Sequence, residues 1–266
     1  MFIEIIKAAI LGVVEGATEF LPISSTGHLI LVNQWISFSN GFTAMFDIVI
    51  QLGAILSVVV YFWDRLWPFG KDAATSKTIW DTWFKAVTGV VPAIILGYFL
   101  GEMAQEKLFN PWVVAIALFV GGLILIFIEK KKQDPRFDSV QKMTYQTAFC
   151  IGLFQCLSMI PGTSRSAATI IGAMLLGVSR TAAVEFSFFL AIPTMVAASG
   201  YSLLKQGLSM TSSEAAILAT GFVTAFLVAW ASIKFLMNYI KNRDFKLFAY
   251  YRIILGALII AYFLFK

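Results

Sequence analysis

The chain has 266 residues, of which 59% are hydrophobic and only 13% charged, and its formal net charge is +5. Soluble domains carry roughly 25% charged residues, so this composition excludes an ordinary soluble protein and predicts an all-α, polytopic membrane protein. The basic residues lie mainly in loops beside apolar segments, where they usually encode membrane topology. We therefore expect membrane lipids as partners and no nucleic acid.

The first apolar run is interrupted. Residues 4–21 and 25–36 are both apolar, but Pro22 breaks the run between them. The second piece is too short to cross a bilayer, which takes about 20 residues. The pattern predicts a re-entrant helical hairpin over residues 4–36, which enters and leaves the membrane on the same face.

Several polar groups gather around this break. Glu15 and Glu19 are four residues apart and therefore share one face of the helix. The Ser-Ser-Thr-Gly sequence at residues 24–27 opens the second helical run, and His28, the only histidine of the chain, lies in its first turn. Serines are natural helix caps, and the free N–H groups of a helix start attract anions. We expect an anion to bind here.

Six later segments are long and apolar enough to cross a bilayer. They cover residues 44–63, 85–101, 112–129, 181–204, 213–238 and 248–265. The segment between Asp64 and Lys85 mixes charges with tryptophans and is expected to be a loop. Residues 133–142 are the most polar stretch, and we interpret them as the joint between two halves of one integral domain. The halves are residues 1–132 and 143–266.

The second half resembles the first in order, although the identity is weak. Three pairs of segments match: residues 151–155 with 11–15, 161–166 with 22–27, and 181–185 with 43–47. This is the trace of an internal duplication, and it predicts a second re-entrant hairpin over residues 145–177. Each half then has three full spans. The odd number of crossings inverts the second half, so the two broken tips can meet near the membrane midplane.

The distribution of basic residues predicts the orientation. Face A, which holds the N-terminus, receives only Lys7, Lys107, Lys205 and Lys266. The opposite face B receives fifteen lysines and arginines, Arg252 among them, and Arg165 is left at the second break. Cytoplasmic loops carry an excess of such residues, so face B is expected to be cytoplasmic. Both termini and the first hairpin then face outside.

Ionisable residues inside apolar segments cost roughly 2.5–3.5 kcal/mol each on insertion scales, so they call for a reason. Arg165 lies between Ser164 and Ser166 at the second break, where a planar fork of donors beside hydroxyls suits a phosphate. Glu15 and Glu19 suit a divalent cation such as Mg²⁺ or Ca²⁺. The alternative is that these charges are structural pairs that tie the broken helices together.

A hydroxyl close to a histidine supplies a nucleophile and a proton carrier. Ser25 lies nearer the break than His28, so we favour Ser25 as the nucleophile, with His28 or a metal-bound water as the alternatives. Asp47 and Glu185 hold equivalent places in the two halves. For these two residues we favour a structural role, as a cap or a tie within each repeat.

The sequence from Glu15 to His28, together with Pro-Gly-Thr-Ser-Arg-Ser at residues 161–166, resembles the undecaprenyl-pyrophosphate phosphatase family of bacteria, also called the bacitracin-resistance (BacA) family. The resemblance extends over the whole chain. It implies hydrolysis of undecaprenyl diphosphate to undecaprenyl phosphate and inorganic phosphate in the inner membrane, which recycles the lipid carrier for cell-wall synthesis. It also implies that this hydrolysis requires a divalent cation. The matching positions are Glu15 and Glu19 (acidic motif), Ser25 and His28 (catalytic pair) and Arg165 (second motif). The expected phosphate-binding residues are Arg165, Ser164, Ser166, Ser24, Thr26 and Gly27.

A transporter or flippase of a phosphorylated isoprenoid lipid is the competing hypothesis. Inverted repeats with broken helices are typical of transporters, and such a protein would use the same arginine and acids for binding without turnover. A channel would need a continuous polar path, and face B supplies no obvious entry to one. The sequence leaves the oligomeric state open, a dimer included.

Overall fold

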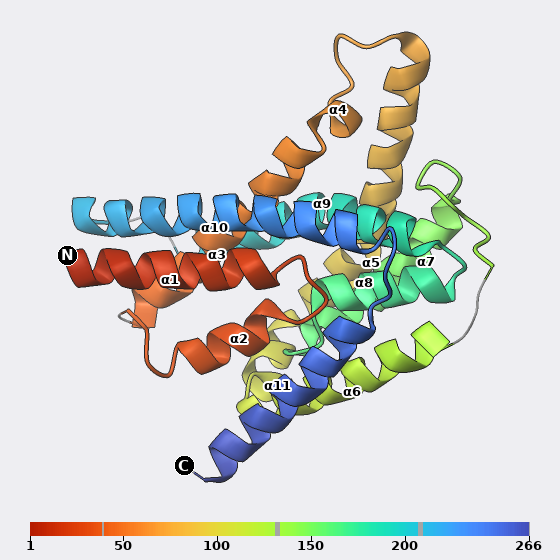
Figure 1. Cartoon of the computed structure of the whole chain (residues 1–266). Helices are drawn as coiled ribbons and strands as arrows, with labels where there is room; N and C mark the ends of the chain where they lie inside the picture. Colours follow the sequence, from red (N-terminus) through yellow and green to blue (C-terminus); the bar gives the residue numbers. More distant parts are fainter. Residues whose placement is uncertain (39, 131–133, 207–209, 266) are drawn as a thin grey trace.

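The computed structural model describes residues 1–38, 40–130, 134–206 and 210–265, and these residues are almost entirely helical (Figure 1). The elements in chain order are α1 (Phe2–Thr18), α2 (Ser25–Val32), α3 (Asn40–Tyr61), α4 (Trp63–Leu66), α5 (Ala73–Leu108), α6 (Pro111–Lys130), α7 (Tyr145–Gln155), the 3₁₀ helix η1 (Cys156–Met159), α8 (Arg165–Leu175), α9 (Arg180–Gln206), α10 (Ser212–Tyr239) and α11 (Lys246–Leu264). In the described ranges the only β pairing is an isolated bridge between Phe137 and Val178. The expected all-α class is confirmed.

Six helices have the length and apolar composition to cross a membrane, as expected. They are parts of α3, α5, α6, α9, α10 and α11, and they cover Gly41–Tyr61, Ala73–Gly101, Pro111–Lys130, Arg180–Leu204, Ser212–Tyr239 and Lys246–Leu264. The chain is therefore a multi-pass membrane protein.

The expected loop before the second span is wrong, because α5 is helical from Ala73 onward. Asp72 caps this helix, and its carboxylate accepts hydrogen bonds of 3.0 Å from the N–H groups of Ala74 and Thr75. With 36 residues at 1.5 Å each, α5 is roughly 54 Å long, whereas the hydrocarbon core of a bilayer is about 30 Å thick. The polar first turns of α5 extend the span, and their charges concealed the helix in the sequence pattern.

The two broken segments form helical hairpins, α1 with α2 and α7 with α8. α1 packs along α10, α7 packs on α5, and both α2 and α8 contact α6 (Figure 1). Small residues allow the close approach of α1 to α10, since a Cβ on Gly12 would lie 2.7 Å from the carbonyl oxygen of Gly221. The re-entrant course of the hairpins through a membrane and the inversion of the two halves remain predictions, as do the boundaries of the halves.

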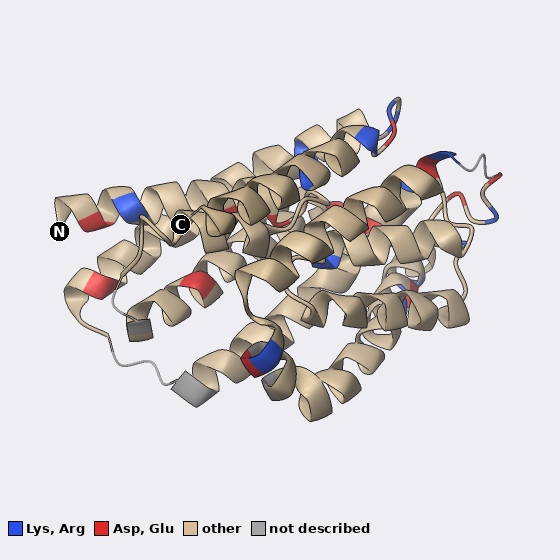
Figure 2. Cartoon of the chain, turned by 90° about the horizontal axis from the view of Figure 1, so that it is seen from below, with Lys and Arg blue, Asp and Glu red and all other residues tan. Residues whose placement is uncertain are grey.

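The charge distribution used for the topology needs one correction. Arg252 was expected at face B, but its side chain in α11 is fully buried. The count then falls to fourteen basic residues against four, while Lys131, Lys132 and Lys266 lie outside the described residues. Figure 2 shows most lysines and arginines toward the end of the molecule opposite the N-terminus. The bias that indicates the orientation therefore persists.

Candidate functional site

The tips of the two hairpins lie against each other. The Ser166 hydroxyl donates to the backbone carbonyl of Leu21 over 2.9 Å, and the Arg165 guanidinium pairs with the Glu19 carboxylate at 3.0 Å. These contacts join residues that are 145 and 146 positions apart. The predicted meeting of the two breaks is therefore present in the structure.

The two breaks share one unusual backbone conformation. Ser24 and Ser164 have φ angles of 72° and 70°, a region that non-glycine residues rarely adopt. Each is the N-cap of the following helix: the Ser24 hydroxyl accepts from Gly27 N–H (3.3 Å) and that of Ser164 from Ala167 N–H (3.2 Å). Such a conformation costs of order 1–3 kcal/mol per residue and is concentrated at functional sites.

This geometry corrects the alignment of the two halves by one residue. The sequence match paired Pro22 with Pro161, which places Ser25 opposite Ser164. The shared cap conformation instead pairs Ser24 with Ser164, so Ser25 corresponds to Arg165. The sequence match aligned the two prolines because proline is a strong helix breaker. In each break, however, the proline lies outside the capping turn.

Glu19 connects the serine to the arginine. Its Oε2 accepts a hydrogen bond of 2.6 Å from the Ser25 hydroxyl, and its Oε1 accepts from Arg165 Nη2 at 3.0 Å. All three side chains are largely buried. A carboxylate at this distance can accept the serine proton, and the arginine beside it forms a charge-assisted hydrogen bond with the same carboxylate.

Arg165 is held on three sides, with one donor group left over. Its Nη1 donates to the Ser187 carbonyl (3.0 Å), its Nη2 also approaches the sulfur of Met195 (3.6 Å), and its guanidinium lies 5.7 Å from the centre of the Phe20 ring. Among the described residues, its buried Nε has no hydrogen-bond partner. The arginine is therefore positioned by the protein and keeps a donor for an anion.

The other expected phosphate-binding groups are partly engaged with one another. The hydroxyls of Ser164 and Ser166 lie 3.0 Å apart, and the Gly27 N–H is used by the Ser24 cap. Thr26 is half-buried and lies next to Ser25 in the first turn of α2. Whether these residues bind phosphate stays a prediction.

His28 bonds away from the serine. Its Nδ1 lies 2.8 Å from the Ser24 carbonyl oxygen, and its Nε2 lies 2.7 Å from the hydroxyl of Tyr251 in α11. A carbonyl oxygen only accepts, so Nδ1 donates, and in the neutral imidazole Nε2 accepts the proton of Tyr251. The expected proximity of Ser25 and His28 along α2 therefore does not give a hydrogen bond between them.

Tyr251 is the site residue that sequence reasoning missed. Its ring stacks on the His28 ring, with centroids 5.6 Å apart and planes 9° from parallel. It lies 223 positions from His28 in the chain, near the start of the last span. Tyrosine is common at that position in membrane proteins for interfacial reasons, so the pattern carried no signal for this contact.

Glu15 is a predicted site residue whose carboxylate is buried without hydrogen-bond partners among the described residues. Its side chain has no exposed surface. Glu19 and Asp47 are near enough for their charges to act on it. Buried carboxylate oxygens without partners are what a hard divalent cation would satisfy, so the residues fit Mg²⁺ or Ca²⁺. Among the described residues no set of three or more acidic, histidine or cysteine side chains is arranged as a complete metal site.

Asp47 and Glu185 differ, although their places in the sequence are equivalent. Glu185 forms an ion pair of 2.5 Å with Arg65, which connects α9 of the second half to α4 of the first. It is therefore a structural tie, but between the two halves and not within one repeat as expected. Asp47 has no such cation among its described partners, and its buried Oδ1 accepts no hydrogen bond there. A tie within the first half is therefore not seen.

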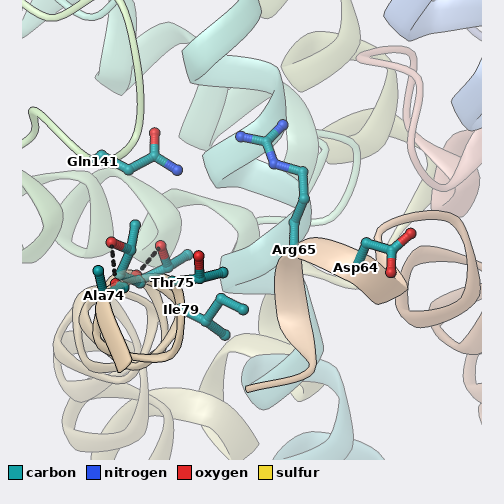
Figure 3. Close-up of a pocket in the computed structure, with 8 residues that line it drawn as sticks. Asp64, Arg65, Ala74, Thr75, Ile79 and Gln141 are labelled. Atoms are coloured by element: carbon teal, nitrogen blue, oxygen red, sulfur yellow. Dashed lines mark hydrogen bonds between the residues drawn. The ribbon is translucent and has the colours of Figure 1, made fainter. Parts of the chain in front are cut away.

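A cavity of about 320 Å³ lies apart from the junction of the two breaks (Figure 3). Its lining consists of Asp64, Arg65, Ala74, Thr75, Thr78, Ile79, Thr82 and Gln141. None of the predicted site residues lines it, and its one cation, Arg65, already pairs with Glu185. The candidate site is therefore the junction of the two breaks rather than this cavity.

Comparison with known proteins decides the family. The family described as "Bacitracin resistance protein BacA" matches residues 8–258. The chain belongs to the BacA family. It is 51% identical to undecaprenyl-diphosphatase 1 of Clostridioides difficile (strain 630), over 98% of this chain and 97% of that protein. It is also 51% identical to an undecaprenyl-diphosphatase of Lachnoclostridium phytofermentans, over 99% and 98% of the two chains.

A further BacA relative is the undecaprenyl-diphosphatase of Enterococcus faecalis, 49% identical over 97% of each chain. These alignments include both breaks and all six spans, because they extend over nearly the full length of each protein. The resemblance inferred from the motifs at residues 15–28 and 161–166 is thereby confirmed at the level of the family.

Proposed function

We propose that this BacA protein hydrolyses undecaprenyl diphosphate to undecaprenyl phosphate and inorganic phosphate. The names of its near full-length relatives support this activity. The observation that carries it in the structure is Glu19, whose two oxygens bond to the Ser25 hydroxyl and to Arg165. A hydroxyl with a proton acceptor, next to an arginine with a free buried donor, is equipped for phosphoryl transfer.

The residues suggest a two-step reaction. Ser25 Oγ attacks the terminal phosphorus while Glu19 takes its proton, and the bond from that phosphorus to the bridging oxygen breaks. Undecaprenyl phosphate leaves, and the phosphoryl group stays on Ser25 until water releases it as inorganic phosphate. Arg165 binds the phosphoryl oxygens during both steps. The start of α2 would add to this stabilisation, since a helix start favours negative charge.

Glu15 and Glu19 are the proposed ligands of a divalent cation, with Glu15 the more available because its oxygens have no other described partner. When bound, such a cation would neutralise part of the diphosphate charge. His28 and Tyr251 form a second hydrogen-bonded pair that can hold or move a proton.

Phosphate release by the purified protein tests the proposal. The protein in detergent is given undecaprenyl diphosphate and Mg²⁺, and inorganic phosphate and undecaprenyl phosphate are measured together. We expect equal amounts of both products. Tight binding of the lipid with no release of phosphate would instead favour a transporter or flippase.

Replacement of Arg165 by lysine tests the role of the arginine. Lysine keeps the charge but loses the planar fork of donors, so Arg165→Lys should lose most of the activity, about 10²-fold or more, while the protein folds and extracts normally. Turnover and the size-exclusion profile are the measurements. Turnover close to that of the unmodified protein would assign Arg165 a purely structural role.

We also propose that the protein lies in the bacterial inner membrane with both termini and the site facing outside the cytoplasm. The bias of fourteen basic residues against four and the odd number of spans in each half support this orientation. Cys150 and Cys156 are first replaced by alanine, and a single cysteine is then added at either terminus. We expect an impermeant thiol reagent to label both termini in spheroplasts. Labelling only after lysis would contradict the orientation.

A further inference from the structure

Arg252 combines full burial with an unusual set of partners. It lies in α11 with no exposed side-chain surface. Its partners in the described ranges are all backbone carbonyl oxygens, five in number: Leu118 (3.4 Å), Pro22 (3.3 Å), Ala117 (3.2 Å), Gly162 (3.3 Å) and Thr163 (3.0 Å). Each of the three guanidinium nitrogens bonds to at least one carbonyl: Nε to Leu118, Nη1 to Pro22, and Nη2 to the other three. Because the side chain is also fully buried, it offers no accessible donor to a substrate.

The carbonyls come from three segments that are distant in the chain. Pro22 belongs to the first break, Gly162 and Thr163 belong to the second, and the other two lie on α6. One side chain of α11 therefore bonds to both breaks at the same time and fixes them to α6. Only the flat, forked shape of arginine can reach acceptors in so many directions.

The bonded carbonyls hold equivalent positions relative to the reactive residues. Pro22 is three residues before Ser25, and Gly162 is three residues before Arg165. This is the register in which the caps Ser24 and Ser164 also correspond. Arg252 thus contacts each break at the same point, just ahead of the residue that is expected to act on phosphate.

The neighbouring helix is shaped to admit the guanidinium. A Cβ on Gly121 of α6 would lie 2.2 Å from Arg252 Nη2 and 2.9 Å from its Cζ, so an alanine at this position would displace the guanidinium. The space that Arg252 occupies therefore depends on a glycine at position 121. This second observation is independent of the hydrogen bonds and shows that the guanidinium position is built in from two helices.

We propose that Arg252 is a positioning residue that sets the register of the two breaks, and through them the arrangement of Ser25, Glu19 and Arg165. The inference rests on the proposed phosphatase activity. Because Arg252 is fully buried and its described partners are all backbone carbonyls, it acts on the reaction only through the residues that it places. A displacement of reacting groups by about 1 Å can lower a rate about 10²-fold, and loss of this shared anchor frees both breaks to move.

The experiment compares Arg252→Ala, Arg252→Lys and Gly121→Ala with the unmodified protein and with Arg180→Ala. Arg180 is the control, because it is another arginine that joins two helices, through the buried carboxylate of Glu129, but it has no hydrogen bond to either break among the described contacts. Turnover per folded protein, KM and thermal stability in detergent are measured, with and without guanidinium chloride, and with sodium chloride as the salt control.

We expect folded Arg252→Ala to lose about 10²-fold in kcat with a smaller change in KM, and guanidinium to restore about tenfold by filling the vacated space. Arg252→Lys should remain impaired, since one ammonium cannot reach both breaks. Gly121→Ala should lower kcat with Arg252 still present. Arg180→Ala should lose thermal stability but keep its turnover, and guanidinium should not affect it.

Two outcomes separate the inference from the function on which it rests. If the unmodified protein releases no phosphate, the proposed function fails. If the unmodified protein is active and folded Arg252→Ala or Arg252→Lys keeps its kcat, the positioning role is wrong. If Arg252→Ala does not fold, the other two variants decide. A normal kcat in both folded Gly121→Ala and folded Arg252→Lys would then overturn the inference.

Discussion

Ser25→Ala should reduce turnover by several orders of magnitude, at least as far as His28→Ala does. A missing nucleophile removes the covalent step itself, whereas a missing proton carrier costs about 10²–10⁴-fold. The structure supports this order, because the Ser25 proton already points to Glu19 while His28 bonds to Tyr251 instead. A reaction quenched rapidly with labelled substrate should carry phosphate on Ser25.

The control for this experiment is Thr18→Ala, which removes a nearby hydroxyl that donates to the Val14 carbonyl and leaves the Ser25–Glu19 hydrogen bond in place. It should fold like Ser25→Ala and keep far more activity. A Ser25→Ala protein with about a tenth of normal turnover would rule out the serine as nucleophile, since that loss is too small for a covalent catalyst. The reaction would then belong to His28 or to a water molecule.

The sequence predicted the parts of this molecule that depend on local patterns. Length and hydropathy give the six spans because a bilayer imposes one scale on every crossing. The break near Pro22 is equally local, since proline and capping serines end and restart helices through their own geometry. Even so, α5 was placed too late, because charged and aromatic residues on an extended helix give the same pattern as a loop.

The contacts between distant segments were only partly predictable. The internal repeat indicated that the two breaks meet, which places Arg165 near Glu19. The sequence alignment of the two breaks was nevertheless one residue out of register. Nothing in the local sequence distinguishes Tyr251 or Arg252 from the interfacial residues that start many spans. Their partners lie 223 and 230 positions away, so only the folded packing of α11 on α6 reveals them.

The difference between local patterns and long-range contacts also explains why equivalent positions in the two halves have different partners. Asp47 and Glu185 share a place in the repeat, yet only Glu185 meets an arginine, because Arg65 follows α3 on the side where α9 packs. A duplicated sequence repeats its local turns but not its surroundings. The first half therefore holds the acids Glu15 and Glu19, and the second half supplies the arginine.

The last prediction separates the roles of these two acids. Glu19→Gln removes the proton acceptor of Ser25 and the counter-charge of Arg165, so turnover should fall about 10²–10⁴-fold even at saturating cation. Glu15 bonds to neither residue among the described contacts, and its oxygens are the ones without partners. Glu15→Gln should therefore act mainly by raising the cation concentration needed for activity.

Binding of Mn²⁺ to the purified protein, followed by electron paramagnetic resonance without substrate, measures the second effect directly. Mn²⁺ suits carboxylate ligands as Mg²⁺ does, and its free and bound forms are easily distinguished. Glu15→Gln should weaken this binding more than Glu19→Gln, while Glu185→Gln, whose carboxylate is engaged with Arg65, should leave it unchanged. Unaltered Mn²⁺ binding in Glu15→Gln would show that the buried carboxylate does not hold the cation.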